Sequence, residues 1–159
     1  MERREFLKLA LGSVALFAFT RRAWAARAIE KLVLSDEEWK TRLPLDVYLV
    51  LRKEGTERPF SSPLLHETRQ GMYVCAGCEL PLFPSEYKYD SDTGWPSFFN
   101  AIPGHLGTRP DHREVIERTE YHCARCGGHH GHLFKDGPKP TGLRYSNNGT
   151  ALKFIPLLL

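Results

Sequence analysis

The two Cys-x-x-Cys pairs constrain this chain more than any other feature. All four cysteines of the sequence fall in them, Cys75 with Cys78 and Cys123 with Cys126. A glycine inside or just after each pair favours a sharp turn, and two such turns can supply four sulfurs in a tetrahedron around one metal ion. The pairs are further apart than in an ordinary zinc ribbon, so we expect strands between them. The sequence therefore predicts one structural zinc ion that clamps two distant parts of the chain.

Two other interpretations of the cysteines stay open. The pairs could form two disulfides if the protein meets an oxidising compartment. The Cys-x-x-Cys spacing also occurs in redox-active dithiols, although two such pairs in one small domain would be unusual. A zinc ion with four thiolate ligands has no open coordination position, so we expect it to stabilise the fold and to take no part in chemistry.

The first 25 residues look like an export signal. Arg3 and Arg4 are followed by Phe-Leu-Lys and an apolar run over residues 9–19. That run is too short for a helix that crosses a bilayer core of about 30 Å, and residues 23–25 (AWA) form a small-x-small cleavage site. We expect a twin-arginine-type signal peptide at residues 1–25, export to the periplasm, and no stable membrane insertion after cleavage. A membrane-surface helix or an uncleaved anchor is the alternative.

The distribution of charge argues against nucleic-acid binding. The formal net charge is +3 and the pI is near 8.7. The leader holds five basic and two acidic side chains, so the rest of the chain, residues 26–159, is neutral. A neutral domain lacks the basic surface that phosphate contacts need, and we expect no nucleic-acid partner.

Residues 26–159 are expected to form one mainly β domain. Ser35, followed by three acidic residues, predicts the start of a short helix that carries Trp39. Pro44 can open a second helix, with Leu45, Val47, Tyr48 and Leu51 on adjacent turns and Gly55 beyond its end. Glycine and proline recur after residue 59, where short strands are favoured. The clearest predicted strands are residues 71–75, 114–118, 120–123 and 152–155. The sequence predicts two short N-terminal helices followed by a compact antiparallel β domain.

Histidines that can carry proton chemistry gather near the second cysteine pair. Four of the seven histidines lie within residues 122–132, and the unperturbed pKa of histidine suits proton transfer near neutral pH. His129 and His132 are three residues apart, so strict strand alternation would place them on opposite faces. A bend at Gly131 would bring both to one side. Alternatively, one histidine is a zinc ligand and the others lie on the surface.

A second polar set follows downstream. Arg144, Ser146 and Asn148 alternate and would share one face of a strand, which is either a solvated face or part of a site. Upstream, Trp95 sits between glycine and proline, where it is either a core aromatic or a partly open apolar platform.

Four longer motifs carry a family resemblance. They are GWPSF at residues 94–98, CGGHHGHLF at 126–134, DGPKPTG at 136–142 and LRY at 143–145. Together with both cysteine pairs they resemble the peptide-methionine (R)-S-oxide reductases, over residues 39–156. The resemblance implies a small antiparallel β fold with a zinc ion held by four cysteines. It also implies an enzyme that repairs oxidative damage by reducing methionine-(R)-sulfoxide in oxidised proteins or peptides. The electrons would come from a thioredoxin-like or other thiol reductant. We expect a monomer.

The resemblance also assigns roles to the polar residues. Trp95 would hold the methyl group of the sulfoxide. His129 and His132 would hold water and protonate the sulfoxide oxygen as it leaves. Arg144 and Asn148 would support the position of the nucleophile.

Two positions depart from the pattern of this family. The family places its nucleophilic cysteine directly after Arg-Tyr, and here that position is Ser146. A serine hydroxyl keeps its proton near neutral pH, is not a soft nucleophile, and cannot form a sulfenic acid. Many members carry a resolving cysteine just before Gly-Trp-Pro, and here that residue is Thr93. Two alternatives therefore stay open: a protein that binds methionine sulfoxide without turnover, and a zinc-ribbon module that contacts a partner through its histidine-rich turn.

Overall fold

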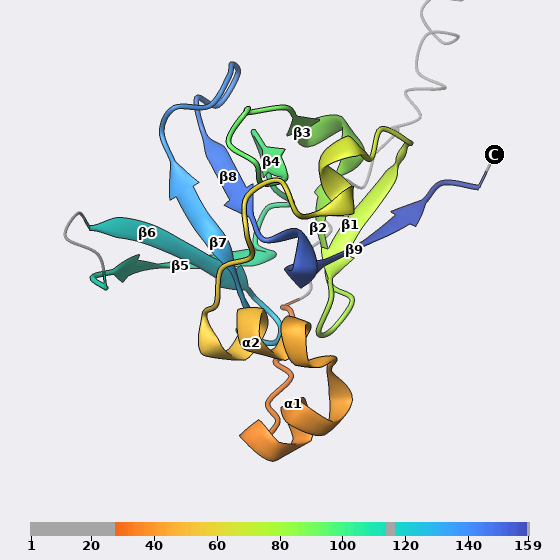
Figure 1. The fold of residues 1–159 in the computed structure, drawn as a ribbon, viewed down its shortest axis with the longest axis vertical. Helices are drawn as coiled ribbons and strands as arrows, with labels where there is room; N and C mark the ends of the chain where they lie inside the picture. Colours follow the sequence, from red (N-terminus) through yellow and green to blue (C-terminus); the bar gives the residue numbers. More distant parts are fainter. Residues whose placement is uncertain (1–27, 114–116, 159) are drawn as a thin grey trace, which may run out of the picture.

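The computed structural model describes residues 28–113 and 117–158. Figure 1 shows these residues as two antiparallel sheets with a pair of helices at one end. The predicted signal peptide at residues 1–25 lies outside the described ranges. Within those ranges, no helix has the length and apolar character that a bilayer crossing requires.

The first helix forms where the sequence predicts it. Helix α1 spans Asp36–Arg42 and begins at a complete capping box. The Ser35 hydroxyl accepts from the Glu38 amide at 3.2 Å, and the Glu38 carboxylate accepts from the Ser35 amide at 2.7 Å. These bonds satisfy amide donors that a helix start leaves free. Trp39 is buried and joins the core.

The second helix, α2, spans Leu45–Lys53 directly after Pro44. Its buried side chains are Tyr48, Val50 and Leu51. Of the apolar residues expected on adjacent turns, Tyr48 and Leu51 are buried, whereas Leu45 in the first turn is 73% exposed.

The strands form two sheets. The three-stranded sheet has the order β2-β1-β9, and the six-stranded sheet has the order β3-β4-β8-β7-β6-β5. Every pair is antiparallel. The strand bounds are β1 Gly71–Cys75, β2 Pro81–Pro84, β3 Lys88–Tyr89, β4 Ser97–Phe98, β5 Leu106–Asp111, β6 Arg118–Cys123, β7 His129–Phe134, β8 Arg144–Asn147 and β9 Leu152–Pro156. Three short 3-10 turns, η1 Pro63–His66, η2 Ser85–Tyr87 and η3 Gly149–Ala151, connect them. The mainly antiparallel β fold with two N-terminal helices is confirmed.

Aromatic side chains fill the space between the two sheets. The rings of Phe83 on β2 and Phe98 on β4 stack with centroids 4.1 Å apart, and Tyr73 on β1 meets the edge of Phe98 at 5.0 Å. All three are fully buried. This aromatic contact holds the three-stranded sheet against the strands that carry the polar residues.

One predicted strand is placed differently. Residues 114–116 of the expected strand 114–118 lie outside the described ranges, and β6 begins only at Arg118. The preceding strand β5 was not predicted, because Gly107 and Pro110 interrupt its pattern. Both residues are tolerated in β5 because it is an edge strand, paired only with β6.

Candidate active site

Most of the residues to which the resemblance assigns a role line one small cavity. Its volume is about 110 Å³. Its lining residues are Thr56, Trp95, Arg118, Gly131, His132, Phe134, Ser146 and Asn148. Pockets for whole small molecules usually measure about 300–1,000 Å³. This cavity therefore has room for the tip of one side chain presented by another polypeptide.

Trp95 forms one wall of the cavity and is only partly buried, as expected for an open apolar platform. Its indole Nε1–H donates to the Glu57 carbonyl at 3.2 Å. The preceding Gly94 has φ +88°, and a Cβ there would lie 2.8 Å from the Phe60 amide nitrogen. Glycine is needed for both reasons, so the Gly-Trp-Pro sequence sets the direction in which the indole projects.

His129 and His132 come together because β7 contains a bulge. Tyr121 of β6 pairs with Gly131 of β7, whereas the next residue of β6, His122, pairs with His129. The extra residue is His130, and one extra residue changes the alternation of side chains along a strand. The His129 and His132 rings therefore meet at 5.6 Å between centroids. A departure from strict alternation was expected at Gly131, and the structure places it at His130.

Ser146 lies on β8, directly opposite His132 on one side and Ser97 on the other. The β7 backbone approaches closely here, since a Cβ on Gly131 would lie 1.9 Å from the Ser146 carbonyl oxygen. Thr93, at the position of a resolving cysteine in many related proteins, bonds through its hydroxyl to Ser91 at 2.8 Å. The described residues carry no thiol in the wall of this cavity.

Asn148 lines the cavity, but its amide group is held by the backbone. Its Nδ2 donates to the His130 carbonyl at 2.9 Å, and its Oδ1 accepts from the Glu57 amide at 3.0 Å. The Glu57 carboxylate in turn accepts from the Gly149 amide at 2.6 Å and from the Thr150 amide at 2.9 Å. Glu57 thus connects Trp95, Asn148 and the η3 turn, a role that no sequence pattern indicated.

Arg144 stands outside the cavity wall. Its guanidinium forms two bonds of 2.8 Å with the Asp136 carboxylate and lies 4.2 Å from the centre of the Phe134 ring. Phe134 itself lines the cavity. The hydrogen bonds from Arg144 hold the pKa of Asp136 below its usual value. Arg144 therefore supports the cavity through a packed ring and an ion pair.

Two buried carboxylates stand behind the histidines. His129 Nδ1 lies 2.9 Å from Glu120 Oε1, and His132 Nε2 lies 2.7 Å from Asp111 Oδ2. Burial lowers the pKa of His132, although the hydrogen bond with Asp111 acts in the opposite direction. Neither acidic residue was predicted from the sequence, because an acidic residue in an edge strand or its neighbour usually faces solvent.

The four cysteines converge at a separate place, beside α2. Their sulfur atoms all lie within 4.8 Å of one another, and all four side chains are buried. The shortest contacts join the two pairs, with 3.7 Å between Cys75 and Cys126 and 3.5 Å between Cys78 and Cys123. Disulfide sulfurs would be about 2.05 Å apart. The four thiols are free and can hold one metal ion.

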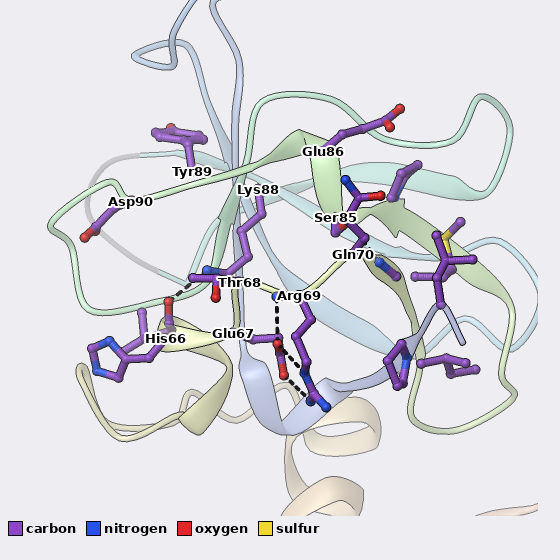
Figure 2. Close-up of a pocket in the computed structure, with 17 residues that line it drawn as sticks. His66, Glu67, Thr68, Arg69, Gln70, Ser85, Glu86, Lys88, Tyr89 and Asp90 are labelled. Carbon is purple, nitrogen blue, oxygen red and sulfur yellow. Dashed lines mark hydrogen bonds and ion pairs between the residues drawn. The ribbon is translucent and has the colours of Figure 1, made fainter. Parts of the chain in front are cut away.

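A larger cavity, about 870 Å³, lies elsewhere. Figure 2 shows Glu67 and Arg69 facing each other in this cavity. They form an ion pair of 2.6 Å. Lys88 Nζ donates to the Leu65 carbonyl at 2.8 Å. This cavity shares no residue with the small one and holds none of the residues that the motifs singled out.

The matching family model and the sequence relatives point to one family. The SelR domain matches residues 43–156. The peptide methionine sulfoxide reductase MsrB of Agrobacterium fabrum is 47% identical over 128 residues, which cover 80% of this chain and 95% of the relative. The MsrB of Bradyrhizobium diazoefficiens is 49% identical over 128 residues, with 80% and 92% covered. The MsrB of Methanosarcina barkeri is 47% identical over 131 residues, with 82% and 90% covered. This chain therefore belongs to the SelR-domain family of MsrB peptide methionine sulfoxide reductases.

Proposed function

We propose that the cavity between Trp95 and His132 binds the sulfoxide of an oxidised methionine and directs its reduction to methionine by a thiol. The observation that carries this proposal is the convergence, in a family of methionine sulfoxide reductases, of an open indole and His132 in the wall of one small cavity. His129 does not line this cavity, but its ring lies 5.6 Å from that of His132. The indole offers an apolar face to the methyl group. The histidines offer groups that can bind and protonate the oxygen.

The overall reaction fixes what the site must supply. One sulfoxide and two thiols give one thioether, one disulfide and one water, so the oxygen takes up two protons while two electrons come from the thiols. Proton delivery matters because the oxygen would otherwise leave as an oxide, and general acid catalysis typically contributes about 10²–10⁴ in rate. Ser146 supplies no thiol, so both thiols come from the external reductant and turnover is slow.

The size of the cavity defines the substrate class. A volume of about 110 Å³ admits the end of a methionine side chain and leaves the rest of the peptide outside. We propose that the substrates are oxidised methionines on exposed or flexible protein segments and that the domain acts as a monomer.

We propose that the ion at the four cysteines is zinc. A tetrahedral zinc with bonds of about 2.3 Å to sulfur separates its ligands by about 3.8 Å. The sulfur contacts of 3.5 and 3.7 Å are close to that value. Cys75, Cys78, Cys123 and Cys126 would hold the ion with no position open for substrate.

Selectivity between epimers tests the proposed reaction. With dithiothreitol and a peptide that contains one methionine sulfoxide, we expect slow reduction of the R epimer and none of the S epimer. Only one epimer can place its methyl group against Trp95 and its oxygen against the histidines. Chromatography of the peptide over time measures both rates.

The control for that assay is the same protein with Trp95→Ala. Removal of the indole should weaken binding of the R epimer and abolish the difference between epimers, while dithiothreitol alone sets the background rate. Equal rates of reduction of the two epimers by the unmodified protein would contradict the proposal. Tight R-selective binding with no reduction at all would instead favour a binding protein.

We also propose export through the twin-arginine route, based on the Arg-Arg-x-Phe-Leu-Lys sequence of the leader. Arg3→Lys together with Arg4→Lys should leave the precursor inside the cell, because the paired arginines are the distinguishing feature of this signal. Cell fractionation with N-terminal sequencing measures the outcome, and a Lys8→Arg variant is the control. Unchanged export, or an exported protein that still begins at Met1, would contradict the proposal.

A further inference from the structure

Each site histidine is hydrogen-bonded, through one ring nitrogen, to a buried carboxylate from another strand of the same sheet. Glu120 of β6 meets His129 Nδ1 at 2.9 Å, and Asp111 of β5 meets His132 Nε2 at 2.7 Å. We propose that Glu120 and Asp111 are positioning residues that hold the two histidines in opposite tautomers, so that His129 Nε2 and His132 Nδ1 are free to take up the proton of the attacking thiol, which then passes to the sulfoxide oxygen. This inference rests on the proposed function.

The tautomers follow from the proton inventory of these pairs. A carboxylate without a proton only accepts hydrogen bonds, so the shared proton must sit on the imidazole. Burial raises the pKa of Glu120, but hydrogen bonds from His122 and His129 lower this pKa to about 2. Hydrogen bonds from Arg113 and His132 hold the pKa of Asp111 well below its usual value. Both groups are therefore carboxylates at neutral pH.

The remaining nitrogen of His129 supports the assignment. Its Nε2 is buried and has no hydrogen-bond partner among the described residues. With the proton on Nδ1, this nitrogen is an unpaired acceptor, and a buried unpaired acceptor is costly unless a ligand or water uses it. The attacking thiol, or a water molecule, has a proton to donate and is the kind of partner that would satisfy it.

Arginines fix the carboxylates from behind. Arg109 Nε lies 2.9 Å from Glu120, and Arg113 holds Asp111 through two bonds of 2.8 and 2.9 Å. Glu54 forms ion pairs with both arginines, the one with Arg113 at 2.7 Å. Glu54 follows α2 directly, in the left-handed conformation with φ 56°. Through these arginines, the residue at the end of α2 helps to position both carboxylates, and the carboxylates position both histidines.

A single isosteric substitution distinguishes a role of Glu120 in positioning His129 from a purely structural role. In Glu120→Gln, the side chain keeps one acceptor oxygen and gains an NH₂ group. Arg109 can only donate and lies at the Oε2 position, so the oxygen stays with Arg109 and the NH₂ group faces His129 Nδ1. His129 must then accept at Nδ1 and carry its proton on Nε2. A purely structural glutamate would leave the tautomer of His129 unchanged.

Long-range ¹H–¹⁵N NMR of the whole chain reads these tautomers directly. In the unmodified protein at pH 8 we expect the proton of His129 on Nδ1 and that of His132 on Nε2. Glu120→Gln should move the His129 proton to Nε2 and leave His132 unchanged, and Glu120→Asp should keep the original tautomer. Glu117→Gln, which changes an exposed partner of His112, is the matched control and should change neither site histidine.

The kinetic consequence is measured in the Ser146→Cys protein, where the chemical step is fastest. Glu120→Gln should lower kcat at least about 10-fold and change KM less than about 2-fold, because proton transfer is affected and substrate contacts are not. Glu120→Asp should restore most of kcat. A folded Glu120→Gln protein with an unchanged tautomer, or a reversed tautomer with unchanged kcat, would overturn the proposal.

The two proposals can fail separately. Inactivity of the Ser146→Cys protein towards the R epimer would contradict the proposed function alone, since the NMR spectra still report the tautomers. An unmodified protein with the His129 proton on Nε2, or the His132 proton on Nδ1, would contradict the positioning role whatever the activity.

Discussion

Ser146→Cys is expected to increase the rate of R-selective reduction by on the order of 10²-fold or more. A thiol at this position is held beside the cavity that Trp95 and His132 line, whereas dithiothreitol must arrive from solution. Well-oriented intramolecular groups can react as if present at about 10⁵–10⁸ M, far above any added reductant. Sulfur is also the softer nucleophile towards a sulfoxide, and a few per cent of an ordinary thiol is thiolate at pH 7.

The gain should be almost entirely in kcat. Exchange of one oxygen for one sulfur atom leaves the contacts with the substrate nearly unchanged, so KM should change little. Steady-state rates with both epimers at saturating dithiothreitol separate the two constants. The control is Ser85→Cys, the same chemical change at the wall of the large cavity, which should add no activity. Rates equal to those of the unmodified protein would place the nucleophile elsewhere.

The cysteines and the glycine-rich motifs were readable from the sequence because their chemistry is local. A Cys-x-x-Cys turn brings its two sulfurs together whatever the surrounding fold does, and the four sulfurs converge as predicted. The mainly β fold was also predictable, since β1 is a short run of mostly apolar residues and burial alternates along β9. The exposed Leu45 shows the limit of such patterns, because a helical face is buried only where a partner covers it.

The histidine site was only partly predictable, because its geometry depends on contacts between distant residues. The convergence of His129 and His132 requires a bulge at His130, and bulges follow from strand pairing rather than from local preference. Asp111 and Glu120 reach the histidines from two other strands, one of them unpredicted. An acidic residue in an ordinary strand carries no sign that it will be buried. Such partners become visible only once the register is known.

Removal of the metal is expected to unfold the domain. Structural zinc sites bind with about 10–16 kcal/mol, and the stability of a domain is about 5–15 kcal/mol, so loss of the ion removes most or all of it. One Cys-x-x-Cys pair begins at the end of β1, and the other lies at the turn between β6 and β7. Both pairs pack against α2. Arg52 of α2 donates to the Cys126 carbonyl at 2.9 Å, and Leu51 lies against Gly77. Without the ion, four buried thiols converge with nothing to hold them.

Cys123→Ser tests this directly, because it removes one ligand from a fully buried position and leaves the active-site residues unchanged. We expect elemental analysis to find one zinc per unmodified chain and none per variant chain, and thermal melting to show a large loss of stability. A chelator should unfold the unmodified protein, and added zinc should restore its fold but not that of Cys123→Ser. The expected order of effects is therefore loss of metal, then loss of fold, then loss of reduction. A metal-free protein that stays folded through two disulfides would contradict the zinc assignment and return the cysteines to the redox interpretation.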